Sequence, residues 1–433
     1  METIVFDQLK ETLYHEQLPN GLNVYILPKQ GFQKTYATFT TRYGSIDNDF
    51  QPPHGERVQV PDGIAHFLEH KMFEQEDGDV FEDFSKNGAS ANAFTSFDRT
   101  AYLFSCTDRV EENLTTLINF VQDPYFTDEN VEKEKGIIGQ EIQMYDDNPD
   151  WRVYFGLIEA MYREHPVRID IAGTVASIAN ITKETLYLCY ETFYHPSNMV
   201  LFVVGGVDHE NIMQLVRDNQ AAKPFEMKGE IKRFYPQETG DIHQSLNEVQ
   251  LPVGISKCLM GFKEEKSALQ GDDFLKREFA TQIALEALFG QSSDLYQRLY
   301  DDGLIDDQFG FDYVLEHGYG FSMFGGDTKD PDALIQRIRS ALPEYVDKGI
   351  ADDVFERLRK KKIGEFLRQL NSPEFIANQF TRYRFNQADL FRVVPVLENL
   401  QVEDINDRLQ HHFQLDRCAA SVVRPLKADA PAS

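Results

Sequence analysis

The alternation of apolar and polar residues predicts strands near the beginning of the chain and again past its middle. Residues 22–27, 35–43 and 100–105 are strand-like runs in the first half, the first two bounded by Gly, Pro or Asp. Residues 199–207 form the longest apolar run, which is far shorter than the roughly 20 residues of a membrane-spanning helix. We interpret that run as a buried strand, and we expect no membrane span.

Helical patterns separate these strands, and the order of elements approximately repeats in the second half. Residues 110–123 and a segment around Glu134 and Glu141 have helical character in the first half. The second half contains a strand-like run, an apolar helix, another strand region and a long helix, at residues 257–262, 279–288, 318–325 and 352–370. The repeated order fits a tandem duplication, and we predict an α+β fold with antiparallel sheets.

The length of the chain indicates two domains, because 433 residues exceed the usual size of a single hydrophobic core. Pro236, Gly240 and polar residues interrupt any periodicity between residues 224 and 245. We therefore predict an N-terminal domain over residues 1–225, a linker over 226–245 and a C-terminal domain over 246–433.

Composition narrows the possible partners and the compartment. The formal charge of −28 argues against nucleic acid and against anionic membrane surfaces as partners. Acidic residues lining a chamber would attract cationic peptides, although solubility is the simpler reason for such a charge. The first residues lack the apolar core of a signal peptide, and the four cysteines have no disulfide or zinc-site spacing. We expect a cytoplasmic protein.

Residues 66–70, His-Phe-Leu-Glu-His, are the strongest chemical signal in the sequence. On a helix, His66 and His70 share one face and can reach a single metal ion, with Glu69 beside them. A catalytic zinc site needs a third protein ligand and an open position for water, and a nearby carboxylate can take the proton of that water. An amphipathic helix with two ordinary histidines would show the same pattern, so a third ligand has to be found.

A predicted helix around residues 131–145 offers Glu132, Glu134 and Glu141 as candidates. Glu134 and Glu141 lie two helical turns apart and share a face, whereas Glu132 points elsewhere. One of the two could bind the metal while the other forms a hydrogen bond to a ligating histidine. Helical geometry does not distinguish between them, and a solvated helix stabilised by Glu–Lys pairs remains an alternative.

Several segments together resemble the pitrilysin, or insulinase, family of zinc metallopeptidases, which are also called inverzincins. They are the turn at residues 44–47, the pentad region 62–73, an edge-strand segment 87–102 and a core strand 194–205. The chain is most similar to bacterial members of Gram-positive species that resemble the mitochondrial processing peptidase. The resemblance implies two similar domains, each a sheet covered by helices, and a second subunit that closes a clamshell chamber around the peptide.

The resemblance also assigns roles to individual residues. It implies one Zn²⁺ per chain held by His66, His70 and Glu141, with Glu69 as the general base and Glu134 supporting the site. An extended peptide would add to the edge strand at Asn92, Ala93, Phe94 and Thr95, where small residues allow close backbone approach. The implied function is a zinc endopeptidase subunit that hydrolyses peptides or small unfolded proteins.

One family feature is absent from the aligned positions. Members carry an Arg and a Tyr, seven positions apart, that hold the substrate and stabilise the oxyanion. Our alignment places Tyr300 and Asp306 at those positions, with Arg298 out of register and Tyr313 as an open substitute. We therefore expect a related subunit to supply the Arg/Tyr pair in a heterodimer, with a homodimer as the other arrangement. The alternative function is a noncatalytic scaffold subunit of a related heterodimer.

Overall fold

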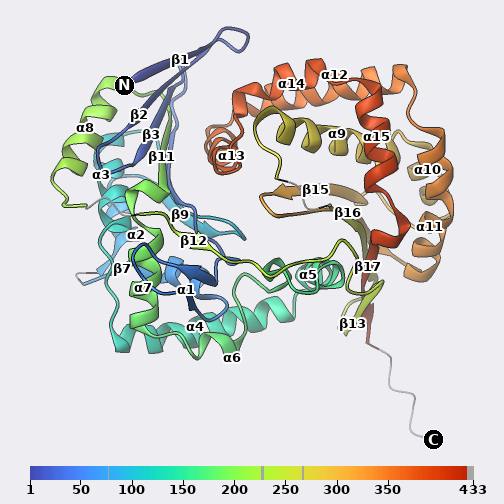
Figure 1. The fold of residues 1–433 in the computed structure, drawn as a ribbon, viewed down its shortest axis with the longest axis horizontal. Helices are drawn as coiled ribbons and strands as arrows, with labels where there is room; N and C mark the ends of the chain where they lie inside the picture. Colours follow the sequence, from blue (N-terminus) through green and yellow to red (C-terminus); the bar gives the residue numbers. More distant parts are fainter. Residues whose placement is uncertain (77, 226–228, 266–267, 427–433) are drawn as a thin grey trace, which may run out of the picture. The chain divides into compact units, whose positions relative to one another are not determined.

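The computed structural model describes residues 1–433 except 77, 226–228, 266–267 and 427–433 (Figure 1). The chain forms two compact units, and each is built from several chain segments. The first unit contains Met1–Ile142, Ile169–Tyr235 and Gln369–Phe385. The second contains Gln143–Arg168, Pro236–Arg368 and Asn386–Ser433.

The first unit is organised around a seven-stranded sheet. Its spatial order is β1 (Glu2–Phe6), β2 (Glu11–Gln17), β3 (Asn23–Pro28), β11 (Met199–Gly205), β4 (Thr35–Thr41), β10 (Thr100–Cys106) and β9 (Ser90–Thr95). All neighbours are antiparallel except β3 and β11. The central strands β4 and β11 are buried along their whole length, which explains their continuous apolar or Thr-rich sequences. Strand β9 lies at the edge.

The second unit contains a five-stranded sheet with the same internal order. It runs β13 (Leu246–Leu251), β17 (Cys418–Pro425), β14 (Ser256–Lys263), β16 (Tyr319–Thr328) and β15 (Gly310–Glu316). The parallel pair β13–β17 occupies the place that β3–β11 occupies in the first sheet, and the other neighbours are antiparallel. The predicted α+β fold of two similar domains is thereby confirmed, with one parallel pair in each otherwise antiparallel sheet.

Helices and short strands complete both units. Those of the first unit are α1 (Ile64–Met72), α2 (Val80–Lys86), α3 (Val110–Val121), α6 (Val175–Ile178), α7 (Lys183–Phe193), α8 (His209–Ala221) and α13 (Pro373–Phe385). Those of the second are α5 (Pro149–Met161), α9 (Gly271–Phe289), α10 (Asp294–Asp301), α11 (Pro331–Lys348), α12 (Asp352–Gln369), α14 (Val393–Asn399) and α15 (Val402–His412). Helix α4 (Asp128–Asp146) begins in the first unit and ends in the second. Short strands of the first unit are β5 (Asp49–Gln51), β6 (Val58–Gln59), β7 (Glu74–Gln75), β8 (Gly78–Asp79) and β12 (Lys232–Arg233).

Two helices pack on a sheet whose strands come mostly from the other half of the chain. Helix α5 precedes the predicted linker, yet it covers β13, β14 and β17 of the second sheet. Gly156 permits this approach, because a Cβ there would lie 2.5 Å from Ser421 Oγ. Helix α13 covers β4 and β11 of the first sheet, where the ring centroids of Phe380 and Phe202 are 4.6 Å apart. The predicted domains, 1–225 and 246–433, place α5 in the first domain and α13 in the second, so they do not include this exchange of helices.

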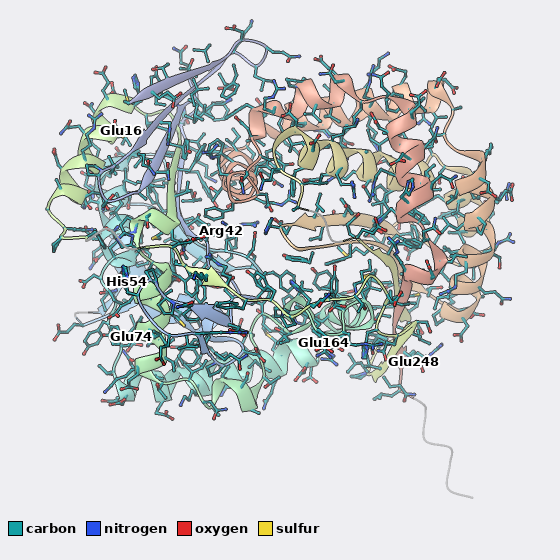
Figure 2. The ribbon with its side chains drawn as sticks, viewed as in Figure 1. Glu16, Arg42, His54, Glu74, Glu164 and Glu248 are labelled. Carbon is teal, nitrogen blue, oxygen red and sulfur yellow. The ribbon has the colours of Figure 1, made fainter. Side chains whose placement is uncertain are left out.

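The connection between the two units is held to each of them by a charged residue. Arg233 Nε donates to Asp47 Oδ1 at 3.0 Å in the first unit. Glu238 accepts hydrogen bonds from the backbone N–H groups of Glu164 and His165, at 2.7 and 2.8 Å, in the second unit. Figure 2 labels Glu164, a residue of the second unit. Residues 226–228 of the predicted linker lie outside the described residues.

The predicted elements are present with small differences at their ends. The strand expected at residues 22–27 is β3, and the helix expected at 110–123 is α3. Helix α9 begins at Gly271, well before the apolar stretch predicted from residue 279. The prediction began late because the first turns of the helix are rich in charged residues. Among the described residues, no helix combines the length and apolar character needed to cross a membrane. The four cysteines are all buried and unpaired.

Candidate metal centre and active site

The helix that carries the His-Phe-Leu-Glu-His pentad, α1, begins at a turn that requires glycine. Gly63 has φ +87°, and a Cβ there would lie 2.3 Å from the carbonyl oxygen of Ala172. The preceding Asp62 is held on both sides: Asn48 Nδ2 donates to its carboxylate at 2.7 Å, and Ser177 Oγ donates to its carbonyl at 2.9 Å. These contacts fix the starting point of α1 against the loop before α6.

Helix α1 is buried along most of its length, and its apolar residues hold the face that carries the histidines. Phe67 and Leu68 are fully buried. His66 and His70 lie on one face, with ring centroids 4.6 Å apart. Glu69 is also buried, at 8% exposure, although it carries a carboxylate. The helical spacing inferred from the sequence is therefore present as a side-by-side pair of imidazoles with a carboxylate next to them.

Helix α4 brings two glutamates to these histidines and separates their roles. Glu141 places its carboxylate oxygens 3.8 Å from His66 Nε2 and 3.6 Å from His70 Nε2. Glu134 instead faces the other ring nitrogen, with Oε1 3.2 Å from His70 Nδ1. Glu132 is exposed and pairs with Lys135. Tertiary packing thus distinguishes glutamates that helical geometry left equivalent.

The three side chains His66, His70 and Glu141 fit a zinc ion. Their ligand atoms lie within 4.8 Å of one another. Ligands at zinc distances of about 2.0–2.2 Å in a tetrahedral site are separated by roughly 3.5 Å, so small side-chain movements would complete the geometry. The Glu134 carboxylate favours the proton on His70 Nδ1, which leaves Nε2 free to bind a metal. Two imidazoles and one carboxylate are a donor set found in zinc peptidases.

The environment prepares the two histidines differently. Burial lowers the pKa of His66, and the neighbouring His70 lowers it further. Burial also acts on His70, but the hydrogen bond with Glu134 and the charges of Glu69 and Glu141 outweigh it and raise its pKa. His66 is therefore neutral at physiological pH, as a metal ligand must be. At His70 a metal ion has to compete with a proton, so metal affinity falls as pH falls.

Glu69 is oriented by a residue of the edge strand β9. Thr95 Oγ1 donates a hydrogen bond of 2.6 Å to Glu69 Oε2. Burial raises the pKa of Glu69, although the Thr95 hydroxyl opposes that rise. Carboxyl groups with a raised pKa are suited to accepting and returning a proton near neutral pH. Thr95 also belongs to the edge segment expected to bind substrate through its backbone, and its side chain holds the candidate base.

Strand β9 has β10 as its neighbour on one side and lies at the edge of its sheet. Ser96 N–H donates to the carbonyl of Arg99 at the hairpin turn. Because hydrogen-bonded and non-hydrogen-bonded pairs alternate along an antiparallel ladder, the backbone groups of Ala93 and Thr95 face the free edge. The Ala93 N–H is bonded at 2.9 Å to the side-chain oxygen of Asn92. Asn92 and Phe94 direct their own backbone groups to β10.

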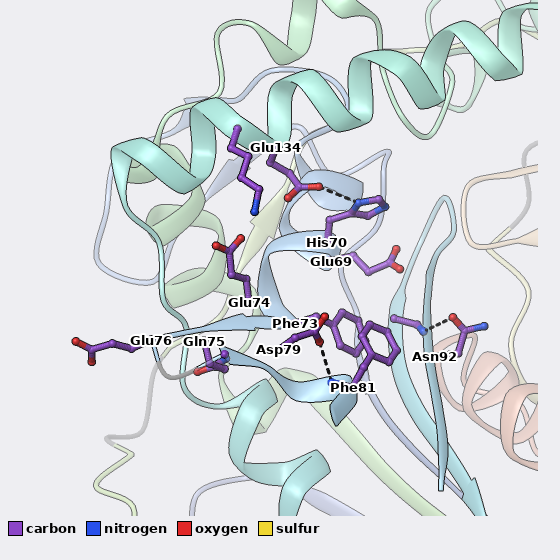
Figure 3. A pocket seen from close by; sticks show the side chains of 13 residues that line it. Glu69, His70, Phe73, Glu74, Gln75, Glu76, Asp79, Phe81, Asn92 and Glu134 are labelled. Carbon is purple, nitrogen blue, oxygen red and sulfur yellow. Dashed lines mark hydrogen bonds and ion pairs between the residues drawn. The ribbon is translucent and has the colours of Figure 1, made fainter. Parts of the chain in front are cut away.

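A cavity of about 620 Å³ lies beside these residues in the first unit (Figure 3). Glu69 and His70 form one part of its wall, and Asn92 and Ala93 of β9 form another. Two stacked aromatic rings contribute an apolar surface, with Phe73 and Phe81 centroids 4.3 Å apart. A further part of the lining comes from Lys133 and Glu134 of α4 and from the β7–β8 segment, with Glu74, Gln75, Glu76, Gly78 and Asp79. A side chain of a bound peptide could enter this cavity next to Glu69.

Two residues that are connected to this centre through Glu134 were not identified from the sequence. Lys71 follows the second histidine and is fully buried, in contact with Glu74 and 3.8 Å from Glu134 Oε2. Its position in the sequence offered one signal, because Lys71 is the one lysine in a short segment of apolar residues and candidate site residues. Glu74 lay outside the motif and had no such signal.

The aligned Tyr300 and the possible substitute Tyr313 both lie in the second unit. Tyr300 is 50% exposed on α10. Tyr313 is buried, and its hydroxyl donates at 2.5 Å to Glu264, which also pairs with His412 and Arg408. Tyr313 is therefore part of a buried ionic network and is not available to a substrate in this arrangement.

Comparison with known proteins gives a consistent family assignment. The sequence profile of insulinase, peptidase family M16, matches residues 55–175, and that of the peptidase M16 inactive domain matches residues 180–362. YmfH of Bacillus subtilis, described as an uncharacterized zinc protease, is 58% identical over 98% of this chain and 99% of its own length.

Solved structures agree with the profiles. A crystal structure of an M16-like peptidase from Alicyclobacillus acidocaldarius superposes with a TM-score of 0.92 at 44% identity, covering 96% of this chain and 99% of that one. Pitrilysin has the same fold, with a TM-score of 0.76 at 14% identity, covering 98% of this chain and 46% of its own. The two matched profiles together span more than half of the chain. The chain therefore belongs to the insulinase family of peptidases, family M16.

Proposed function

We propose that this chain is a zinc-dependent endopeptidase subunit that hydrolyses peptides or small unfolded proteins. The observation that carries the proposal is the convergence of His66, His70 and Glu141, with Glu69 beside them on the wall of a cavity. The similarity to a protein named as a zinc protease supports the same class of reaction. One zinc ion per chain would be held by the two Nε2 atoms and the Glu141 carboxylate.

The proton transfers are assigned to Glu69. A bound zinc ion would act as a Lewis acid, polarising a carbonyl group and lowering the pKa of a water molecule bound to it to about 7. Glu69 Oε2 accepts the Thr95 hydrogen bond, and we assign Oε1 to receive the proton of the attacking water. Glu69 then donates that proton to the leaving amine and returns to its charged form. The burial that raises the pKa of Glu69 helps it to hold the proton between these two transfers.

The substrate is proposed to add to the free edge of β9 as an extended strand. Ala93 and Thr95 offer outward backbone groups, and Asn92 and Phe94 alternate with them along the strand. The Asn92 side chain has to leave the Ala93 N–H before a substrate carbonyl can bind there. Main-chain recognition of this kind places little demand on the substrate's sequence, so the cavity beside Glu69 is the place where side chains would be selected.

A second subunit is part of the proposal. The aligned Arg/Tyr positions hold Tyr300 and Asp306, so donors for the oxyanion have to come from elsewhere. We propose that a related subunit without the zinc motif supplies them in a cytoplasmic heterodimer that encloses the peptide, with a homodimer as the other arrangement.

The test is a Glu69→Gln variant of the full chain, assayed with zinc analysis. General acid–base catalysis typically contributes about 10²–10⁴-fold, so peptide hydrolysis should fall by at least about 10²-fold. Zinc content should stay at one ion per chain, because the three proposed ligands are unchanged. Full activity in the variant would contradict the assignment of Glu69. Wild-type protein without zinc and without peptidase activity, alone or with its partner, would favour the scaffold function instead.

A further inference from the structure

Lys71 is a buried charge beside a proposed metal ligand, and the function proposed above does not use it. Its side chain is 0% exposed, and it follows His70 directly on α1. A buried ammonium group is costly unless acidic groups compensate it. Its Nζ contacts Glu74 Oε2 and lies 3.8 Å from Glu134 Oε2.

Glu134 is held from two sides as a result. Its Oε1 is 3.2 Å from His70 Nδ1, and its Oε2 is directed to Lys71. Figure 3 shows the Glu134 carboxylate pointing to the His70 ring. The two contacts together fix the orientation of the carboxylate, and that orientation decides which nitrogen of His70 faces Glu141.

Glu74 connects the same ammonium group to the cavity. It is the first residue of β7 and lines the cavity beside Glu69, with its side chain 37% exposed. A continuous series of contacts therefore runs from the cavity wall to the metal-facing ring, through Glu74, Lys71, Glu134 and His70.

We propose that Lys71, anchored by Glu74, is a positioning residue that holds Glu134 against His70 and thereby strengthens zinc binding. The inference rests on the proposed zinc site. It also goes beyond that site, because it makes Glu74, a residue of the cavity wall whose contact is with Lys71 and not with one of the three zinc ligands, a determinant of metal affinity.

Positioning and simple charge effects predict opposite results. A positive charge near a bound cation repels it, so a purely electrostatic role for Lys71 would mean that its removal tightens zinc binding. A positioning role means that Glu134 loses its second contact and turns from His70 Nδ1, which weakens binding. Loss of such outer contacts typically costs about 10–100-fold in metal affinity.

The experiment compares zinc affinity of full-length wild-type protein with that of Lys71→Met, Glu74→Gln and the double variant, by competition with a chelator. Thermal unfolding of the metal-free proteins is measured in parallel. We expect about a tenfold loss of zinc affinity for Lys71→Met, a severalfold loss for Glu74→Gln, and a double variant no worse than Lys71→Met alone.

Lys263→Met is the matched control. Lys263 is also a buried lysine, 2.6 Å from Glu238, but it belongs to the second unit. Its loss should lower the melting temperature without changing zinc affinity. If Lys71→Met fails to fold, the zinc affinity of Glu74→Gln tests the positioning role instead. The Glu74 side chain is partly exposed, so this variant should fold.

Unchanged or tighter zinc binding in the foldable variants would overturn the positioning role. That result, in a wild type that binds zinc and hydrolyses peptides, would leave the proposed function intact. A wild type that binds no zinc would contradict the proposed function and this inference together.

Discussion

At the scale of single residues, the contact between Thr95 and Glu69 shows how the edge strand orients the proposed general base. Thr95 stands on β9 and Glu69 on α1, and the 2.6 Å hydrogen bond joins the two elements next to the cavity. Glu69 is buried, so a missing donor at Oε2 would leave a carboxylate poorly compensated. The hydroxyl of Thr95 therefore orients the base and also helps to keep it charged.

Replacing Thr95 with Val removes this hydroxyl and keeps the shape of the side chain. A hydrogen bond to a charged group is worth about 1.5–3 kcal/mol, so we expect kcat to fall roughly tenfold or more with a smaller change in KM. Thr95→Ser retains the hydroxyl and serves as the control, with kcat close to wild type. Steady-state kinetics on a peptide substrate measure both. Wild-type kcat in Thr95→Val would show that Glu69 needs no help from β9.

At the scale of elements, the exchange of α5 and α13 is the feature that shapes each unit. An amphipathic helix is stabilised by whichever apolar sheet face it covers, and chain order does not restrict that choice. Gly156 allows α5 to approach β17, and Phe380 packs α13 against Phe202 of β11. The connection between the units is then held at fixed points, one of which is the Glu238 carboxylate.

Glu238→Gln tests that fixed point through its pH dependence. Although burial opposes it, hydrogen bonds from Lys263 and from three backbone N–H groups lower the pKa of Glu238 from its usual value of 4.5 to about 2. A lowered carboxyl pKa stabilises the folded state above the unfolded pKa, and this stabilisation is lost as pH falls through the folded value.

The wild type should therefore exceed the variant in unfolding free energy by about 1–2 kcal/mol at pH 7. Solvent screening at this partly accessible group keeps the difference small. Below about pH 4 the difference should shrink. Denaturant unfolding at several pH values measures it. Glu230→Gln, an exposed change on the same connection, should leave the unfolding free energy at pH 7 close to that of the wild type. A difference that stays constant down to pH 2.5 would contradict the ionic role of Glu238.

At the scale of the whole molecule, the two units repeat one sheet order but do not repeat the metal centre. Within the described ranges, His66, His70 and Glu141 are the one group of side chains whose geometry suits a metal ion, and all three belong to the first unit. The second unit instead buries an ionic network around Glu264 and Tyr313. Within the described residues, the duplicated architecture thus carries the candidate metal centre in one of its two units.

The proposed partner is tested by reconstitution. Adding a related subunit that carries an Arg/Tyr pair and lacks the zinc motif should raise peptide hydrolysis at least tenfold over this chain alone, because oxyanion donors contribute about 10²–10³-fold in kcat. The same subunit with both residues replaced by Ala is the control and should bind without stimulating. High activity of the isolated chain, unaffected by any such subunit, would remove the need for a partner.

The sequence by itself determined the local elements and the chemical type of the site. Helical spacing in the pentad requires His66 and His70 to share a face, and strand periodicity identifies β3, β4, β10 and β11. Both follow from the backbone geometry of short segments. The family resemblance then selected Glu141 over Glu134, a choice that spacing alone left open.

Only the tertiary structure decided which distant segments meet. It placed Thr95 on Glu69, Lys71 between Glu74 and Glu134, and α5 on the second sheet. Apart from Lys71 and Glu74, which lie three residues apart, these contacts join residues whose separation along the chain carries no periodic signal. They depend on how apolar faces pack and on how buried charges find counterions, and both are properties of the folded chain as a whole.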